Sequence, residues 1–378
     1  MKLPTFVIAL VLATPLLANN PIPGFADTSG LNSGATGSDA NNLADSTLDA
    51  ADPVNMATGE FYFTRQLMAL GGPLPLGFGI AYSSGGGVAT GGVETTPQGL
   101  GGMAGKFRRS HHAFVQRVNI DFGPGFQFTQ AFVRMGLGED LAFQLNTTTS
   151  QWEQLSDTPE RHELIETTTH YYLSEPGRGV VHMFVKAAGE DAAPRTHVVD
   201  RNGNTLTYTL PANHDEATTT GPISVSDGLG RSLAFGYTSV GGVNMLTSVT
   251  DHTGRAWTFQ YENDPADNPP ADATPLVTLR SITDPLGGVC TFTYQGTNRI
   301  AAKQMPRGNS PYSQTYSATL TDAAVLTQSD ALGRVFTFSS EAPVIGLGDR
   351  HRTITHPDGS RRGFFHGCAG HAHGWRAG

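Results

Sequence analysis

The stretch Asp251-His-Thr-Gly254-Arg255-Ala-Trp257-Thr-Phe259-Gln-Tyr261 combines a tight turn with the strand that follows it. Asp at the first position and Gly at the fourth are typical of a type I turn. Trp257, Phe259 and Tyr261 then recur at every second residue, which places the three side chains on one face of a β-strand. The stretch therefore predicts one arm of a β-hairpin whose aromatic side chains face a core.

The pattern is repeated along the second half of the chain. Asp-x-x-Gly begins at Asp200, Asp227, Asp251, Asp284 and Asp330. Apolar or aromatic residues follow each Gly at three residues (Leu206, Leu233, Trp257, Cys290, Phe336) and at five (Tyr208, Phe235, Phe259, Phe292, Phe338). At seven residues stand Leu210, Tyr237, Tyr261 and Tyr294, and Ser340 breaks the pattern. Because one hairpin is unstable alone, the copies predict antiparallel hairpins stacked into a curved sheet or partial β shell.

Composition agrees with an all-β fold. The 378 residues include 46 Gly and 23 Pro, which suits many turns, and only 15% of them are charged. Apolar residues also alternate in 106–195, as in Leu141-Ala-Phe143-Gln-Leu145, so we expect a β-rich region there. The formal net charge of −9, with no long run of Lys and Arg, argues against a nucleic-acid partner.

The N-terminus predicts export across the inner membrane. Met1-Lys2 precedes a short apolar run from Thr5 to Leu17, which is typical of a signal peptide over residues 1–18. Residues 19–50 are rich in small and polar residues, and we interpret them as a flexible leader. No later apolar run has the length of a membrane span. The expected location is periplasmic, cell-surface or secreted.

A second recognisable stretch precedes the repeats, within a segment that we place at 51–105. It reads Asp52-Pro53-Val54-Asn55, Thr58-Gly59-Glu60, Gly72-Pro73-Leu74-Pro75-Leu76 and Tyr82. Together with the repeats, it resembles the bacterial Rhs/YD-repeat family, whose units read as Asp-x-x-Gly-Arg and end at Tyr. Arg231, Arg255 and Arg334 match the Arg of that family, whereas Asn204, Gly288 and Ala81 depart from its pattern. The resemblance covers 52–84 and 198–340.

The resemblance implies a β shell that encapsulates or presents a C-terminal toxin or effector. This sequence carries neither the self-cleaving core motif of the family nor a toxin domain, so we expect the opening part of a shell, with repeats over 196–345 and an irregular tail over 346–378. Asp358-Gly359 looks like the start of another repeat that is not completed. A truncated member of the family is the hypothesis, which the DNA sequence beyond codon 378 would test.

The carboxylates offer little sign of catalysis. Asp227, Asp251 and Asp284 have turn roles that need no chemistry. Glu163 and Glu166 are close to His162, but on a strand they would face opposite sides, and we expect a solvated edge. No Gly-x-Ser-x-Gly motif supports a hydrolase. We predict no catalytic residue and no enzyme activity.

Cofactors and metals are not expected either. His366, Cys368, His371 and His373 could ligate a metal, but their spacing matches no zinc module. The Gly-rich run over 91–105 lacks the ending of a phosphate-binding loop. Cys290 occupies a core position of the repeat, which predicts a buried thiol instead of a disulfide.

These observations favour a non-enzymatic, exported structural or interaction module. The expected partner is a C-terminal effector region or a cell-surface component. The alternative is a secreted carbohydrate- or surface-binding β-protein, which would need aromatic side chains on the solvent side of its strands. An exported hydrolase is a third possibility, and it would need paired carboxylates in a cleft.

Overall fold

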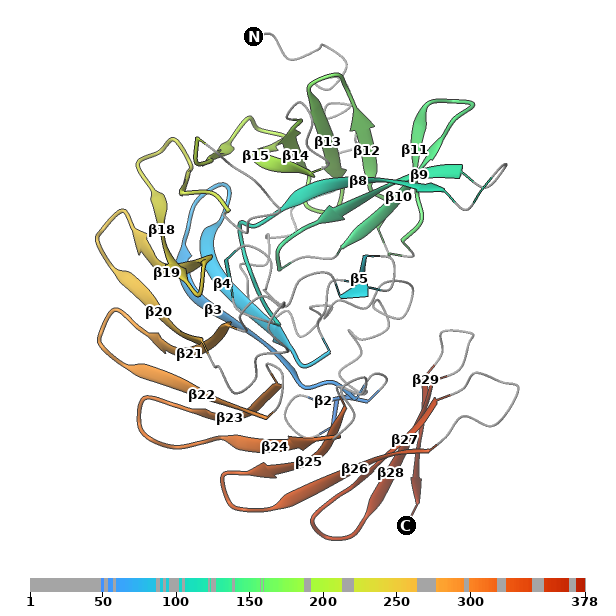
Figure 1. Ribbon diagram of the computed structural model, residues 1–378, viewed down its shortest axis with the longest axis vertical. Coiled ribbons are helices and arrows are strands. Elements are labelled where there is room, and N and C mark those ends of the chain that lie inside the picture. Colours follow the sequence, from blue (N-terminus) through green and yellow to red (C-terminus); the bar gives the residue numbers. More distant parts are fainter. Residues whose placement is uncertain are drawn as a thin grey trace.

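The computed structural model describes residues 49–377 except for 51–53, 57–58, 86–88, 91–92, 95–101, 104–105, 122, 124–126, 138–139, 157, 159, 187–191, 213–220, 264–276, 296–298, 318–323, 342–349 and 367–371. The described residues are all-β, with antiparallel strands in large sheets and no helix (Figure 1), as predicted. Accordingly, no described segment is a helix long and apolar enough to cross a membrane. The predicted signal peptide lies outside the described residues.

The first part of the fold, which we call the head, runs from residue 49 to residue 112. Its centre is a three-stranded sheet in which β4 lies between β3 and β7. The sequence Gly71-Gly72-Pro73 makes the turn between the two long strands. The strands of the head are β1 (Asp49–Ala50), β2 (Val54–Asn55), β3 (Tyr62–Leu70), β4 (Leu76–Ser83), β5 (Ala89–Thr90), β6 (Val93–Glu94) and β7 (Phe107–Arg109).

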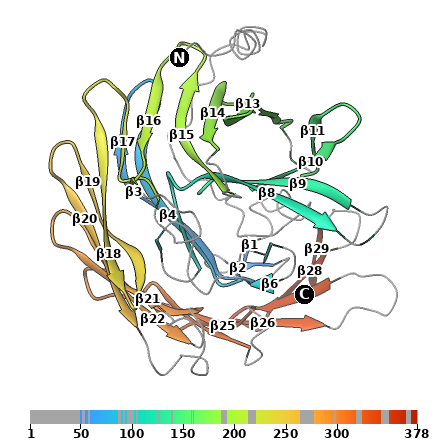
Figure 2. The same cartoon turned by 45° about the horizontal axis from the view of Figure 1, so that its top comes forward.

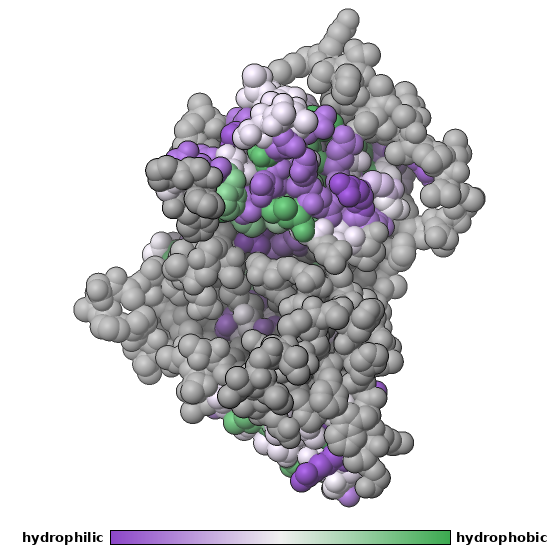
Figure 3. Space-filling model, turned by 90° about the vertical axis from the view of Figure 1, so that its right-hand side faces the viewer, coloured by the Kyte–Doolittle hydropathy of each residue, from purple (hydrophilic) through white to green (hydrophobic). Residues whose placement is uncertain are grey.

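The second part, the upper lobe, is an eight-stranded sheet curled into a ring (Figure 2). Its first strand pairs with its last, through Val115 and Ala193. The strands are β8 (Phe114–Asp121), β9 (Gln127–Arg134), β10 (Leu141–Asn146), β11 (Gln151–Gln154), β12 (Glu163–Glu166), β13 (His170–Glu175), β14 (Val180–Val185) and β15 (Ala192–Asp200). In the part of the chain described, no backbone register joins β11 to β12, so the ring is not a closed sheet. Its own apolar core includes Phe143, Leu173 and Phe184, and Figure 3 shows a mainly hydrophilic surface on the described upper part of one face.

The third part, the repeat sheet, continues from β15 in strict chain order. Each strand pairs antiparallel with the next. The strands are β16 (Thr205–Thr209), β17 (Ser224–Ser226), β18 (Ser232–Val240), β19 (Val243–Asp251), β20 (Ala256–Asn263), β21 (Val277–Thr283), β22 (Val289–Gln295), β23 (Arg299–Gln304), β24 (Tyr312–Tyr316), β25 (Val325–Asp330), β26 (Val335–Glu341), β27 (Arg350–Thr355), β28 (Arg361–His366) and β29 (Ala372–Ala377). The predicted inward phase is confirmed, since Phe259 is buried and Trp257 and Tyr261 pack against the same core.

Four tyrosines on the inner face of the repeat sheet each join the two arms of their own hairpin. Tyr261 Oη donates to the carbonyl oxygen of Leu246 at 2.7 Å, on the preceding strand β19. Equivalent bonds join Tyr237 to Pro222, Tyr294 to Leu279 and Tyr316 to Ile300. The pairing register shifts beside each of these four tyrosines. Because a bulge bends and twists the strand that carries it, its repetition explains why the sheet curves steadily in one direction.

The head fills the concave side of the repeat sheet. In Figure 1, β3 and β4 lie along the inside of the curve formed by β18 to β25. The ring of Phe78 lies 6.0 Å from those of both Phe235 and Phe259. Phe61 and Tyr312 meet edge to face at 5.2 Å. Head and repeats therefore share one apolar core.

The tail differs from the sequence-based expectation. Residues 346–378 were expected to be irregular, yet β27, β28 and β29 extend the repeat sheet through this region. The turn between β27 and β28 has the backbone hydrogen bonds of the other turns, with His356 in the place of Asp and Gly359 at φ +83°. The sequence pattern missed this hairpin because it required Asp at the first position. A turn at Met305–Asn309 was missed for the same reason.

Cys290 provides a test of the shared core. Its side chain is buried, as predicted, and burial raises the pKa of its thiol. Because the thiolate is the reactive form, we expect a maleimide reagent to label Cys290 slowly in the native protein and rapidly after unfolding. Labelling followed by peptide mass spectrometry gives both rates in a Cys368→Ala background. Native labelling as fast as unfolded labelling would contradict the assignment.

Candidate functional site

The Asp residues of the repeats are held in their turns. Asp251 Oδ1 accepts the backbone N–H groups of Thr253 and Arg255 at 2.9 and 3.0 Å, and Oδ2 accepts Arg255 Nε at 2.7 Å. Burial alone would raise the pKa of Asp251, but the hydrogen bonds from Thr253 and Arg255 outweigh it and hold that pKa far below its usual range. Asp227 and Asp330 have the same arrangement with Arg231 and Arg334. These carboxylates are fully used by the turn.

The turn also explains the repeated glycine. Gly254 donates its N–H to the carbonyl of Asp251 and has φ +87°, and the N–H of Asp251 bonds to the carbonyl of Arg255. This is a type I turn followed by a one-residue bulge, which requires the left-handed conformation that Gly adopts without strain. Asp, Gly and Arg of the repeat thus form one structural unit.

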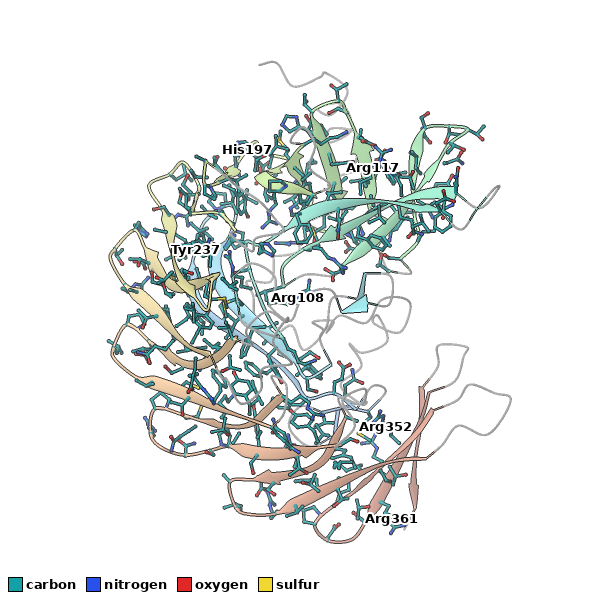
Figure 4. All side chains as sticks on the ribbon, viewed as in Figure 1. Arg108, Arg117, His197, Tyr237, Arg352 and Arg361 are labelled. Atoms are coloured by element: carbon teal, nitrogen blue, oxygen red, sulfur yellow. The ribbon has the colours of Figure 1, made fainter. Side chains whose placement is uncertain are left out.

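Glu166 lies in a charged cluster inside one end of the upper lobe. Its Oε1 accepts Lys186 Nζ at 2.6 Å and Arg117 Nη1 at 3.0 Å, and its Oε2 accepts Trp152 Nε1 at 3.2 Å. Figure 4 labels Arg117 in this lobe. Burial alone would raise the pKa of Glu166, but the bonds from Lys186 and Arg117 outweigh it, so the pKa is lowered.

This arrangement corrects one expectation and suggests a structural role. Glu163 is exposed as expected, but Glu166 does not belong to a solvated edge, because it shares the inward face of β12 with Leu164. Its bond to Trp152 joins β12 to β11 at the place where the backbone register is interrupted. A carboxylate held ionised by two cations is unsuited to act as a general acid.

A second polar network connects the three parts of the fold. His182 Nε2 donates to Glu175 Oε2 at 2.9 Å, and its Nδ1 accepts Arg195 Nη1 at 3.3 Å. The guanidinium of Arg195 lies 4.5 Å from the ring centroid of Tyr208 on β16. The network thus begins on β13 of the upper lobe and reaches the repeat sheet.

His111 carries the same network into the head. Its Nε2 donates to the carbonyl of Gly77 at 2.5 Å, so its Nδ1 is the acceptor for the hydroxyl of Tyr208 at 3.2 Å. Its backbone has φ +67°, a strained conformation for a residue with a side chain. Burial lowers the pKa of His111 to about 3, with the nearby Arg195 as the next cause. The imidazole is therefore neutral and fully hydrogen-bonded.

Of this network, the sequence pattern singled out Tyr208 alone, as an aromatic position of the repeat. His111, His182 and Arg195 belong to no motif, and they meet only because β15 pairs with strands of both the upper lobe and the repeat sheet. Each of these three side chains makes hydrogen bonds or a cation–π contact to other parts of the fold. Their arrangement supports cohesion between the three parts more directly than it supports catalysis.

The side chains of the candidate metal ligands in the tail lie outside the described part of the structure. Cys368 and His371 lie outside the described residues, and His366 and His373 lie in β28 and β29, whose side chains are not described there. Among the described residues, no group of three or more His, Cys, Asp or Glu side chains could hold a metal ion.

Comparison with known proteins finds a family match in the head alone. Residues 51–102 match the family described as "Domain of unknown function (DUF6531)". No curated protein matches the chain. Among solved structures, the chain is similar to "Crystal Structure of TcdB2-TccC3", with a TM-score of 0.32 and 12% identity over 77% of this chain and 20% of that one. It is also similar to "Crystal Structure of TcdB2-TccC3-Cdc42", with a TM-score of 0.25 and 9% identity over 82% of this chain and 18% of that one. The chain thus spans about a fifth of the structures that it matches.

The buried network predicts that stability depends on pH. Burial, above all, lowers the pKa of His182 to about 4, whereas an unfolded histidine titrates near 6.5. Because the folded value is the lower one, this contribution to stability is complete above pH 6.5 and is lost as the pH falls toward 4. The loss from His182 should be on the order of 3 kcal/mol.

His182→Gln tests this expectation, since an amide can still donate to Glu175 and accept from Arg195. Urea unfolding at several pH values between 7 and 4.5 should give a flatter dependence for His182→Gln than for the parent protein. His252→Gln, on an exposed turn, is the matched control and should leave the dependence unchanged. Equal slopes for His182→Gln and the parent would show that His182 does not titrate in this range.

Proposed function

We propose that the chain is a non-enzymatic, exported structural module of the Rhs/YD type, which presents or helps to encapsulate a C-terminal effector region. The observation that carries the proposal is the use of each repeated residue in building a continuous sheet. Asp, Gly and Arg form the turns, and the aromatic residues form the core and the interstrand bonds. The match of the head to a domain family over residues 51–102 agrees with the resemblance of the same stretch to bacterial members.

The position of the head favours presentation of an effector region over its encapsulation. The concave side of the described repeats already carries β3, β4 and β7, whose aromatic rings contact those of the sheet. An effector would therefore not lie against this inner face while the head is in place. This arrangement favours a module that supports and presents a following region, with the sheet extended from β29.

A fusion experiment tests export and presentation together. A β-lactamase without its own signal, attached after Gly378, should appear outside the cytoplasm and should be removable by protease at a cleavable linker. A variant with Leu10→Glu in the apolar run should retain the activity inside the cell, because a charge there disrupts the signal. Cytoplasmic activity from the unaltered fusion would contradict the proposal, and a linker fully protected from protease would contradict presentation and favour encapsulation.

Two assays on the purified protein distinguish the structural role from an enzymatic and from a carbohydrate-binding function. We expect no turnover of glycoside or ester probes and no binding on a glycan array. Turnover that disappears in Glu166→Gln would make the protein an enzyme, and specific glycan binding would favour a secreted carbohydrate-binding protein. Either result would overturn the structural role.

A further inference from the structure

One edge of the repeat sheet carries a regular series of turns. The connections β15–β16, β19–β20, β21–β22, β23–β24, β25–β26 and β27–β28 share the same two backbone hydrogen bonds. The β17–β18 connection has one of them, from the N–H of Asp227 to the carbonyl of Arg231, and all seven connections lie on this edge. At the third position of these turns, Leu alternates with polar residues: Asn202, Leu229, Thr253, Leu286, Arg307, Leu332 and Asp358. Apolar side chains thus recur at every second turn.

These leucines are unusually exposed. Leu229, Leu286 and Leu332 have exposed fractions of 65%, 96% and 79%. Two exposed valines, Val289 and Val335, follow the second and third of them on the same hairpins. Five of the eight exposed large apolar residues in the described chain therefore lie along this edge. A row of exposed apolar side chains along one edge is a candidate contact surface, although the leucines do not form one contiguous patch.

The fold does not require leucine at these positions. The same turn forms around Thr253, with Gly254 at φ +87°, as around Leu286, with Gly287 at φ +84°. A polar residue would serve the turn equally and would avoid exposing an apolar side chain to water. The leucines are therefore better explained by a contact than by the geometry of the hairpin.

In two of these turns the Asp side chain is more buried than the Arg side chain that it pairs with. The side chain of Asp251 is 0% exposed and that of its partner Arg255 is 57% exposed. For Asp330 and Arg334 the values are 23% and 61%. In these two turns the carboxylates turn in toward backbone N–H groups and the guanidinium groups face outward, whereas Arg231 in the turn at Asp227 is only 21% exposed and Asp358 is an exposed anion. Arg201, Arg307 and Arg361 add exposed cations, the last of them at the lower end of the edge in Figure 4.

We propose that this turn edge docks on an anionic phospholipid bilayer, with Leu286 and Leu332 entering the interface and Arg307 and Arg334 contacting lipid phosphates. The turns that carry the two leucines are four strands apart, roughly 19 Å along the sheet. Arg307 belongs to the turn between them. Alternating apolar tips and cations fit the boundary between acyl chains and anionic headgroups. Because the edge is convex (Figure 1), Leu229 provides a separate contact farther along the curve.

This inference goes beyond the proposed structural role, and its test does not use the effector region. The full chain is mixed with vesicles of phosphatidylcholine alone or with 30% phosphatidylglycerol, and flotation measures the bound fraction. We expect binding to the anionic vesicles that weakens as salt increases. Leu286→Thr with Leu332→Thr should reduce the partition coefficient roughly tenfold or more, since two apolar insertions are lost.

Matched variants keep the result interpretable. Leu155→Thr removes a leucine of 49% exposure in the upper lobe and should leave binding unchanged. Arg307→Gln with Arg334→Gln should lower the salt dependence. The turn variants should keep the thermal midpoint of the parent protein, because Thr253 occupies the same turn position.

Three results would overturn the proposal. One is the absence of binding to anionic vesicles at low salt, and another is binding that the leucine variants leave intact. The third is an oligomer of the parent protein that becomes monomeric in the leucine variants, which would identify a second copy of the chain as the partner.

Discussion

The packing of the head hairpin against the concave side of the repeat sheet is the contact on which the rest of the structure depends. The inner faces of β18 to β25 carry aromatic and aliphatic side chains that a single-layered sheet would leave in water. β3 and β4 cover that face, and Tyr82 of the head accepts the backbone N–H of Ile300 at 2.8 Å. Gly59 accepts the N–H of Val325 at 2.8 Å. The head is therefore part of the same folding unit as the repeats.

The curvature that makes room for the head comes from the repeats themselves. Each register shift bends the sheet. Where β19 pairs with β18, the shift lies beside Leu246, and the hydroxyl of Tyr261 on the next strand donates to the carbonyl of Leu246. Ile300 joins the head to a tyrosine of the repeats, because its N–H donates to the hydroxyl of Tyr82 and its carbonyl accepts the hydroxyl of Tyr316. The aromatic residues of the repeat thus determine both the shape of the sheet and its attachment to the head.

Short-range patterns in the sequence predicted the features that depend on neighbouring residues. The alternation at Trp257, Phe259 and Tyr261 gave the correct inner face, because the side-chain period of a strand is two. The turn at Asp251–Gly254 followed from side-chain hydrogen bonding and positive φ. The hairpins at Met305 and His356 were missed, because their turns need only the Gly conformation and not the Asp.

The long-range features had no local signal. Glu166 meets Arg117 across the ring of the upper lobe, and the two are 49 positions apart in the chain. His111 and Tyr208 are 97 positions apart. Both contacts depend on the pairing of β15 with β8, which no periodicity in either strand discloses. The same holds for the place of the head, because nothing in its sequence indicates the surface that it covers.

The most direct test of a shared head and repeat core is hydrogen exchange measured by mass spectrometry across a series of urea concentrations. If the two parts form one cooperative unit, peptides from β3 and β4 and peptides from β18 to β23 should exchange with the same free energy and the same urea dependence. Exchange of the head peptides at a clearly lower free energy, while the repeat peptides remain protected, would contradict the account.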